Sequence, residues 1–337
     1  MLGKQSTFHI GELSEIASAR RAGNELARKL GFDEVRTGQV ALVITEAATN
    51  IVKHAGEGEI LLRARHTDGC DGIEIVALDR GPGIANIAMR MMDGNSSTET
   101  YGVGLGAIGR LSSEFDMYSA EGQGTVLVMT VWSSAAGPAP LDWEVGAVCI
   151  ALAGEDVCGD AFEVRCDARG ASIAMADGLG HGPDAALASE PAVELVLSRP
   201  GRSAGELMQL AHEALRGTRG AAMAVAVIDS DRGSVTFAGI SNIAGSVFNT
   251  GPRRHLMSHN GIVGSNLRKV HEFVHPWQSG ALLIMHSDGI GTRWDLSAYP
   301  GLESRNPTLI AAVLYRDFAR ARDDASILVV RQRPDLA

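Results

Sequence analysis

Four acidic residues in the second half of this sequence each border an apolar run, although they are far apart in the chain. They are Asp160 in VCGDAF, Asp177 in IAMADGLGHG, Asp288 in LLIMHSDGI and Asp323 in RDDASILVV. Carboxylates that converge beside buried strands are costly to desolvate, and they repel one another. Divalent cations relieve that conflict, and ligand sets made only of oxygen suit Mg²⁺ or Mn²⁺. The pattern therefore predicts a two-metal site.

The residues next to these acids indicate how such a site could hydrolyse a phosphate ester. Asp177 and Gly178 end the run SIAMA before a helix, and the Gly178 carbonyl could reach a metal without a side chain intervening. A water bridging two ions about 3.5–4 Å apart is activated to attack phosphorus in line. His181 could protonate the leaving oxygen, or it could simply begin the helix. Each Asp-Gly pair could equally be an ordinary turn or cap.

The first half carries a second polar pattern, within TEAATNIVKHAGEG. Glu46 and Asn50 are four residues apart and share one face of a helix, and His54 follows one turn later. On its own, this stripe could be an exposed polar face. We expect His54 to be a structural hydrogen-bonding residue rather than a catalytic one.

Glycine-rich segments follow and favour a nucleotide pocket. Asp79 ends the run IEIVAL, and Gly81 and Gly83 come directly after it, where a flat base could approach the backbone closely. Gly-rich loops before a helix present amide groups to phosphate. The glycines of that kind are Gly102, Gly104 and Gly106 in YGVGLGAIGRL, and Gly124-Thr125 begins the last strand of the pattern.

Elements predicted for the first half form an α/β sandwich, with a mixed sheet and helices on one side of it. We expect helices over 14–30, 35–54 and 105–114, a Gly-rich loop over 80–104, and strands over 59–66, 73–79, 115–119 and 125–132. Residues 133–142, SSAAGPAPLD, are typical of a linker.

Elements predicted for the second half form an α+β domain, a β-sandwich flanked by helices. We expect strands over 145–152, 161–167, 171–176, 222–229, 234–239, 244–248, 281–286 and 326–331, with helices over 182–198, 203–216 and 307–321.

Composition limits the function classes. The chain has 337 residues, 45% of them hydrophobic, and a net charge of −10, which suits two globular domains and disfavours nucleic-acid binding. Four cysteines without a CxxC pair predict a reduced, cytoplasmic protein. No apolar stretch of about 18 residues occurs, so we expect no membrane span.

The first-half motifs, taken together, resemble the GHKL (Bergerat-fold) ATPases, and among them the serine-protein kinases of bacterial anti-sigma and stressosome switches. The runs ITEAATNIVKHAGEGEI, DRGPGIANI and GVGLGAIGRLSSEFDMYS carry the resemblance over about residues 10–132. It implies that Asn50 coordinates the Mg²⁺ of bound ATP and that Glu46 is the general base. It further implies that Asp79 reads adenine above Gly81 and Gly83, with Thr125 nearby. Gly102, Gly104 and Gly106 would form a mobile lid.

The second-half motifs resemble the type 2C-like (PPM) protein Ser/Thr phosphatases, in their bacterial sporulation and stress-response branch. The pieces GD, ADGLGHG, SDGI and DDASILVV lie within residues 143–331, and the match departs from the branch at VCGDAFEV. The resemblance implies that Mn²⁺ or Mg²⁺ is held by Asp160, Asp177, Gly178, Asp288 and Asp323, the last preferred over Asp324. With the linker at 133–142, we expect the domains to span 1–132 and 143–337.

These resemblances imply a bifunctional regulator. The first domain would phosphorylate Ser or Thr on a partner, and the second would dephosphorylate a phosphoprotein. The implied partner is a STAS-domain anti-sigma antagonist or a stressosome protein, and a homodimer is compatible with the sequence. One alternative is a phosphatase gated by an ATP sensor that transfers no phosphate. Another is a non-catalytic module that binds a sigma factor.

Overall fold

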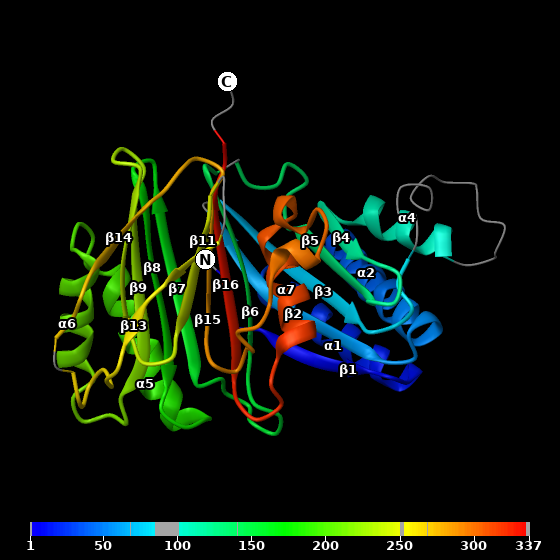
Figure 1. The fold of residues 1–337 in the computed structure, drawn as a ribbon. Coiled ribbons are helices and arrows are strands. Elements are labelled where there is room, and N and C mark those ends of the chain that lie inside the picture. The colour runs from blue at the N-terminus through cyan, green and yellow to red at the C-terminus, as the bar shows by residue number, and fades with distance from the viewer. Residues whose placement is uncertain are drawn as a thin grey trace. The chain divides into compact units, whose positions relative to one another are not determined.

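The computed structural model describes residues 2–67, 69–84, 101–139, 141–249, 253–267 and 269–334. These residues form two compact units, drawn in Figure 1. The first contains Met1–Pro140 and Leu296–Arg316, and the second contains Leu141–Asp295 and Asp317–Ala337. Residues 296–316 thus pack with the first unit, although the sequence places them in the second domain. The domain boundaries themselves remain predictions.

A five-stranded sheet forms the centre of the first unit. Its strands are β1 (Ser6–Ile10), β2 (Gly58–Thr67), β3 (Cys70–Asp79), β4 (Glu114–Ser119) and β5 (Thr125–Trp132). They are ordered β1-β2-β3-β5-β4, and each pair of neighbours is antiparallel. The expectation of a mixed sheet is therefore wrong, because short connections such as that between β4 and β5 join strands as hairpins. Strand β1 was not predicted.

Helices α1 (Leu13–Lys29), α2 (Glu34–His54) and α4 (Tyr101–Leu111) cover one face of this sheet (Figure 1). Asp33 begins α2, and its side chain accepts a hydrogen bond of 2.7 Å from the Arg36 amide. The apolar side of α2, with Val40, Ile44 and Ala47, joins Ile75 and other sheet residues in a continuous core. Both long helices match the prediction to within a residue at each end.

The opposite face of the sheet is covered by α7 (Pro307–Phe318), which corrects the expectation of helices on one side only. Arg63, Glu74 and Thr130 lie opposite one another on β2, β3 and β5. Successive side chains alternate between faces, so these three point away from the core that contains Ile75. Thr308 of α7 donates a hydrogen bond to Glu74, which places α7 on that second face.

The second unit contains two sheets. Their strands are β6 (Trp143–Ile150), β7 (Asp160–Asp167), β8 (Gly170–Gly178), β9 (Ala221–Asp229), β10 (Ser234–Ile240), β11 (Ala244–Phe248), β12 (Arg254–Leu256), β13 (Ser258–His259), β14 (Phe273–Pro276), β15 (Leu282–His286) and β16 (Ala325–Gln332). One sheet has the order β13-β10-β9-β8-β7, with β14 beside β10, and the other has the order β12-β11-β15-β16-β6.

The two sheets of this unit pack face to face, and helices flank them. Gly245 of β11 lies against the Phe237 ring of β10, which joins the inner faces. Helices α5 (Pro183–Leu197) and α6 (Ala204–Ala214) cover the β8–β9 side through a cluster that includes Met208 and Met223. The predicted β-sandwich with flanking helices is confirmed. In the described part of the chain, we find no helix with the length and apolar character needed to cross a membrane.

Candidate functional sites

The polar side chains of α2, Glu46 and Asn50, lie against helix α4. A Cβ atom added at Gly104 would lie 3.4 Å from Asn50 Oδ1 and 3.6 Å from Glu46 Oε2, so the α4 backbone rests on both side chains. The buried Nδ2 of Asn50 has no hydrogen-bond partner among the described residues. A buried amide left unsatisfied costs free energy, which is typical of a group that awaits a ligand.

Asp79 ends β3 and is held from two sides. Its Oδ1 accepts hydrogen bonds from the amides of Gly81 (2.8 Å) and Thr125 (3.2 Å). Burial raises the pKa of Asp79, and these two hydrogen bonds oppose that shift. Gly83 has φ +73°, and a Cβ there would lie 2.0 Å from the carbonyl oxygen of Ala120. This turn therefore requires glycine.

Asn50, Asp79 and Thr125, of the predicted nucleotide residues, line one small cavity of about 20 Å³. It is lined by Ala47, Asn50, Ile51, Ala77, Asp79, Ile84, Leu105, Thr125 and Leu127. A volume of this size holds about one water molecule. Leu105 of α4, only 2% exposed, closes one side. A nucleotide can enter only if α4 moves away from α2.

The glycines expected to form a lid lie within helix α4. Gly102, Gly104 and Gly106 are helical residues, whereas the sequence predicted a loop as far as residue 104. Much of the predicted Gly-rich loop, residues 85–100, lies outside the described residues. The lid role of the three glycines remains a prediction.

Two of the acidic residues in the second unit lie directly opposite each other. Asp160 begins β7 and is paired with Asp177 near the end of β8. Asp160 is 5% exposed, and its Oδ2 accepts a hydrogen bond of 2.7 Å from Ser326 Oγ. Burial, with the charges of nearby carboxylates, raises the pKa of Asp160 to about 7. The same two causes raise the pKa of Asp177 to about 8.

Asp288, Asp323 and Asp324 contribute to the field around Asp177, so the chain does gather these carboxylates. Asp324 is buried, and its two oxygens accept hydrogen bonds from the amides of Leu152 (2.8 Å) and Gly159 (2.9 Å). Asp323 is only half-buried, and burial with the Asp288 charge raises its pKa. Asp324 therefore anchors loops, which supports the choice of Asp323 as a ligand.

The turn after Asp177 leaves no space for a side chain. A Cβ atom at Gly178 would lie 2.0 Å from the carbonyl oxygen of Ala185, so helix α5 can approach only a glycine. The Gly178 amide donates a hydrogen bond of 3.1 Å to the Gly159 carbonyl. This contact ties the end of β8 to the residue before Asp160.

The donor chemistry of this cluster fits a hard divalent cation, because all the side chains offer carboxylate oxygen. Burial first, and then the charges of neighbouring acids, raise the pKa values of Asp160 and Asp177, and a bound cation would offset both effects. As they stand, however, no three His, Cys, Asp or Glu side chains among the described residues are close enough together to hold a metal ion. Cation binding therefore requires the carboxylates to reorient.

Sequence reasoning missed several polar residues beside the cluster, among them Ser326, Glu155 and Arg320. Glu155 lies 2.6 Å from Nδ1 of His181, and it sits in a loop whose sequence, LAGEDV, carries no recognisable motif. Arg320 donates a hydrogen bond of 3.0 Å to the carbonyl oxygen of Asp288. Glu155 can orient His181, and Arg320 places a positive charge beside the acids.

Comparisons with known proteins match each half of the chain separately. Residues 11–131 match the family described as “Histidine kinase-like ATPase domain”, and residues 167–333 match “Stage II sporulation protein E (SpoIIE)”. The serine/threonine-protein kinase RsbT of Bacillus subtilis (strain 168) is 36% identical over 131 residues, covering 39% of this chain and 98% of RsbT. The phosphoserine phosphatase RsbX of the same organism is 23% identical over 138 residues, covering 41% of this chain and 69% of RsbX.

One similar solved structure is described as “The bacterial stressosome: a modular system that has been adapted to control secondary messenger signaling”. It is 30% identical, with a TM-score of 0.53, over 56% of this chain and 99% of its own. The chain therefore belongs to the family of RsbT-like serine/threonine-protein kinases in its first part, and it joins that kinase-like ATPase domain to a SpoIIE-family phosphatase domain.

Proposed function

We propose that this protein dephosphorylates a phosphoserine or phosphothreonine protein at the acidic cluster and phosphorylates a Ser or Thr residue at the α2–α4 pocket. The observation that carries the proposal is that Asp160 and Asp177 lie opposite each other on β7 and β8, with the charges of Asp323 and Asp324 acting on both. Burial and these charges both disfavour the ionised carboxylates, and bound cations would offset both effects.

In the phosphatase reaction, Asp160, Asp177, the Gly178 carbonyl, Asp288 and Asp323 would hold two Mn²⁺ or Mg²⁺ ions. Such ions activate a water as nucleophile and neutralise the phosphate charge. Asp324 and Gly178 keep the loops around the ligands in place through their backbone hydrogen bonds. His181, held at 2.6 Å from Glu155, can give a proton to the leaving serine oxygen.

In the kinase reaction, Asp79 would accept a hydrogen bond from the adenine amino group and Asn50 would coordinate the Mg²⁺ of ATP. Glu46, one helical turn from Asn50, can accept the proton of the attacking hydroxyl. The orphaned Nδ2 of Asn50 and the small cavity beside it support this assignment. Gly81 and Thr125 hold Asp79 in position through their amides, and Gly83 permits the turn that follows it. Gly102, Gly104 and Gly106 would move with the lid.

The partner we propose is a STAS-domain anti-sigma antagonist or a stressosome protein. RsbT and RsbX support this class, since one is a serine/threonine-protein kinase, the other a phosphoserine phosphatase, and the similar solved structure is described as part of a stressosome. We propose that the substrate is a separate chain.

A second candidate is a phosphatase whose first unit senses ATP without transferring phosphate. In both candidates α4 must move before a nucleotide fits the cavity of about 20 Å³ that Leu105 closes, so the cavity does not decide between them. The two candidates differ in whether phosphate reaches a protein.

The test is incubation of the intact protein with γ-labelled ATP and purified STAS-domain substrates, followed by Mn²⁺-dependent release of phosphate from the phosphorylated form. The kinase proposal predicts labelling that Glu46→Ala abolishes, and the phosphatase proposal predicts release that Asp177→Asn abolishes. Release without labelling would select the sensor. Absence of both reactions would contradict the proposed function.

A further inference from the structure

The segment that carries α7 connects the two candidate sites along the chain. It leaves the second unit after Asp295, a short distance beyond Asp288, and packs with the first unit over Leu296–Arg316. It then returns at Asp317, shortly before Asp323. Two proposed metal ligands therefore lie on either side of a segment that is built into the nucleotide-binding unit.

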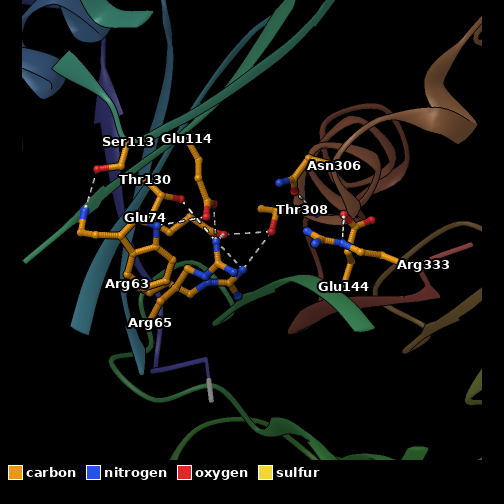
Figure 2. A network of polar contacts seen from close by, with 11 residues as sticks. Arg63, Arg65, Glu74, Ser113, Glu114, Thr130, Glu144, Asn306, Thr308 and Arg333 are labelled. Atoms are coloured by element: carbon orange, nitrogen blue, oxygen red, sulfur yellow. Dashed lines mark hydrogen bonds and ion pairs between the residues drawn. The ribbon is translucent and has the colours of Figure 1, made fainter. Parts of the chain in front are cut away.

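The start of α7 is fixed to the second face of the sheet. The Asn306 amide donates a hydrogen bond of 2.9 Å to Asp116 Oδ2 on β4. Two residues further on, Thr308 Oγ1 donates a hydrogen bond of 3.0 Å to Glu74 Oε2. Glu74 also pairs with Arg63 at 2.5 Å, and both side chains are 1% exposed (Figure 2). A buried pair of this kind resists separation, because either partner alone would be an uncompensated charge.

The end of α7 is fixed beside the nucleotide pocket. Tyr315 donates a hydrogen bond of 3.3 Å to Glu59 Oε2 at the start of β2. Arg80, the residue after Asp79, donates a hydrogen bond to the main-chain oxygen of Arg316. Glu59 follows Gly58, the residue that pairs with Asp79 across β2 and β3. The contacts of Tyr315 and Arg316 therefore lie at the strand ends near Asp79, the proposed adenine acceptor.

The returning chain is fixed, in turn, at the turn that carries Asp288. The Arg320 amide donates a hydrogen bond of 2.8 Å to the Gly289 carbonyl, and its guanidinium donates one of 3.0 Å to the Asp288 carbonyl. The Gly291 amide donates a hydrogen bond of 2.8 Å to the Phe318 carbonyl. A displacement of the end of α7 would therefore move the turn that carries Asp288 and the chain leading to Asp323.

We propose that α7 is a coupling element through which adenine nucleotide at the Asp79 pocket strengthens cation binding at the acidic cluster. This inference rests on the proposed function of both sites. Nucleotide orders the strand end at Asp79 and Arg80, which restrains the last turn of α7. The chain leading to Asp323 is then already ordered before a cation binds. Cation binding therefore costs less conformational entropy.

Coupling of this kind is reciprocal. If nucleotide tightens cation binding, the cation tightens nucleotide binding by the same factor. Coupling free energies between sites commonly correspond to factors of about 5 or more. We expect the Mn²⁺ concentration for half-maximal hydrolysis of p-nitrophenyl phosphate to fall about fivefold when ADP saturates the intact protein.

The experiment is a Mn²⁺ titration of hydrolysis with and without saturating ADP, with free Mn²⁺ calculated for each mixture. GDP at the same concentration controls for chelation by the diphosphate, which would shift the titration in the opposite direction. Hydrogen–deuterium exchange of residues 317–324 provides a readout that is independent of activity. We expect ADP to slow exchange there in the intact protein before any Mn²⁺ is added.

Variants separate coupling from binding. Arg80→Ala removes the bond to the α7 carbonyl, and Tyr315→Phe removes the bond to Glu59. Both variants should bind ADP and hydrolyse the substrate. The about fivefold effect of ADP on the half-maximal Mn²⁺ concentration, however, should be largely lost in each of them. The matched control is Arg305→Ala, which loses a 3.2 Å contact with Asp116 near the start of α7 and should retain the full shift.

The outcomes distinguish the inference from the proposed function. ADP binding and Mn²⁺-dependent hydrolysis that do not influence each other would overturn the coupling alone. A shift that survives both Arg80→Ala and Tyr315→Phe would overturn the role of α7. Failure of calorimetry to detect ADP binding, or of the intact protein to hydrolyse the substrate, would overturn the proposed function and this inference with it.

Discussion

Asp177 shows how a single carboxylate links the fold to the chemistry. It lies opposite Asp160 and among further acids, and its pKa is raised to about 8. Replacing it with asparagine removes a charge and a metal ligand but keeps the shape of the side chain. The neighbouring acids then repel one another less, while the cations lose a contact.

We therefore predict that Asp177→Asn lowers Mn²⁺-dependent hydrolysis of a phosphoserine peptide by about a hundredfold or more, since a metal supplies several kcal/mol of charge stabilisation. ADP affinity measured without added Mn²⁺ should be unchanged. The checks are a steady-state phosphate-release assay and calorimetry. Wild-type hydrolysis by the variant would exclude Asp177 as a ligand.

Asp79 supports a separate prediction in the other unit. Asp79→Asn keeps an oxygen that can accept the amides of Gly81 and Thr125, but it removes the negative charge that we expect adenine to meet. A hydrogen bond to a charged group contributes about 1.5–3 kcal/mol, so ATP affinity should fall about tenfold or more. An unchanged dissociation constant in a titration with ATP would contradict the placement of adenine at Asp79.

Elements show where sequence reasoning succeeded and where it did not. Helix α2 was predicted almost to the residue, because its apolar periodicity and the Asp33 cap are local signals. The cover provided by α7 was missed, since it depends on residues far apart in the chain. A signal was present nonetheless: the sequence of β5, TVLVMTVW, is almost continuously apolar, whereas an antiparallel strand with one solvated face alternates apolar and polar residues.

The buried pair Arg63–Glu74 beneath α7 leads to an element-scale prediction. Glu74→Ala leaves the Arg63 guanidinium buried without its carboxylate, and breaking such a pair costs about 3–5 kcal/mol. The midpoint of denaturant unfolding of the first unit should fall accordingly. Glu25→Ala, which removes an exposed carboxylate paired with Lys29, is the matched control and should leave the midpoint unchanged. Equal effects of the two substitutions would contradict the buried role of Glu74.

The molecule as a whole joins two units through a segment that the sequence assigns to one and the fold to the other. Each unit was predictable because its motifs, such as ADGLGHG, are compact in sequence. The gathering of Asp160, Asp288 and Asp323 was inferred from their places beside apolar runs and from resemblance, since no local rule fixes the register that brings distant strand ends together. Residues 296–316 pack with the first unit although the residues on both sides of them belong to the second, and no local sequence pattern indicates this arrangement.

The packing of residues 296–316 with the first unit predicts how a fragment of that unit would behave. Residues 1–140 alone lack α7, so the second face of the sheet, with Leu61, Val76 and Val128, would be uncovered. Uncovered apolar surface is destabilising in proportion to its area. The fragment should melt at a lower temperature than the intact chain and bind a hydrophobic dye, and a fusion that restores residues 296–316 should reverse both effects. A fragment as stable as the same unit in the intact chain would refute the covering role of α7.

The central claim is that the carboxylates of the second unit gather to hold divalent cations. The most direct measurement is a crystal structure of the protein with Mn²⁺, read from anomalous scattering of the metal. The account predicts two manganese ions contacted by Asp160, Asp177, the Gly178 carbonyl, Asp288 and Asp323. A well-ordered cluster of these residues without manganese, at a concentration that supports hydrolysis, would contradict it.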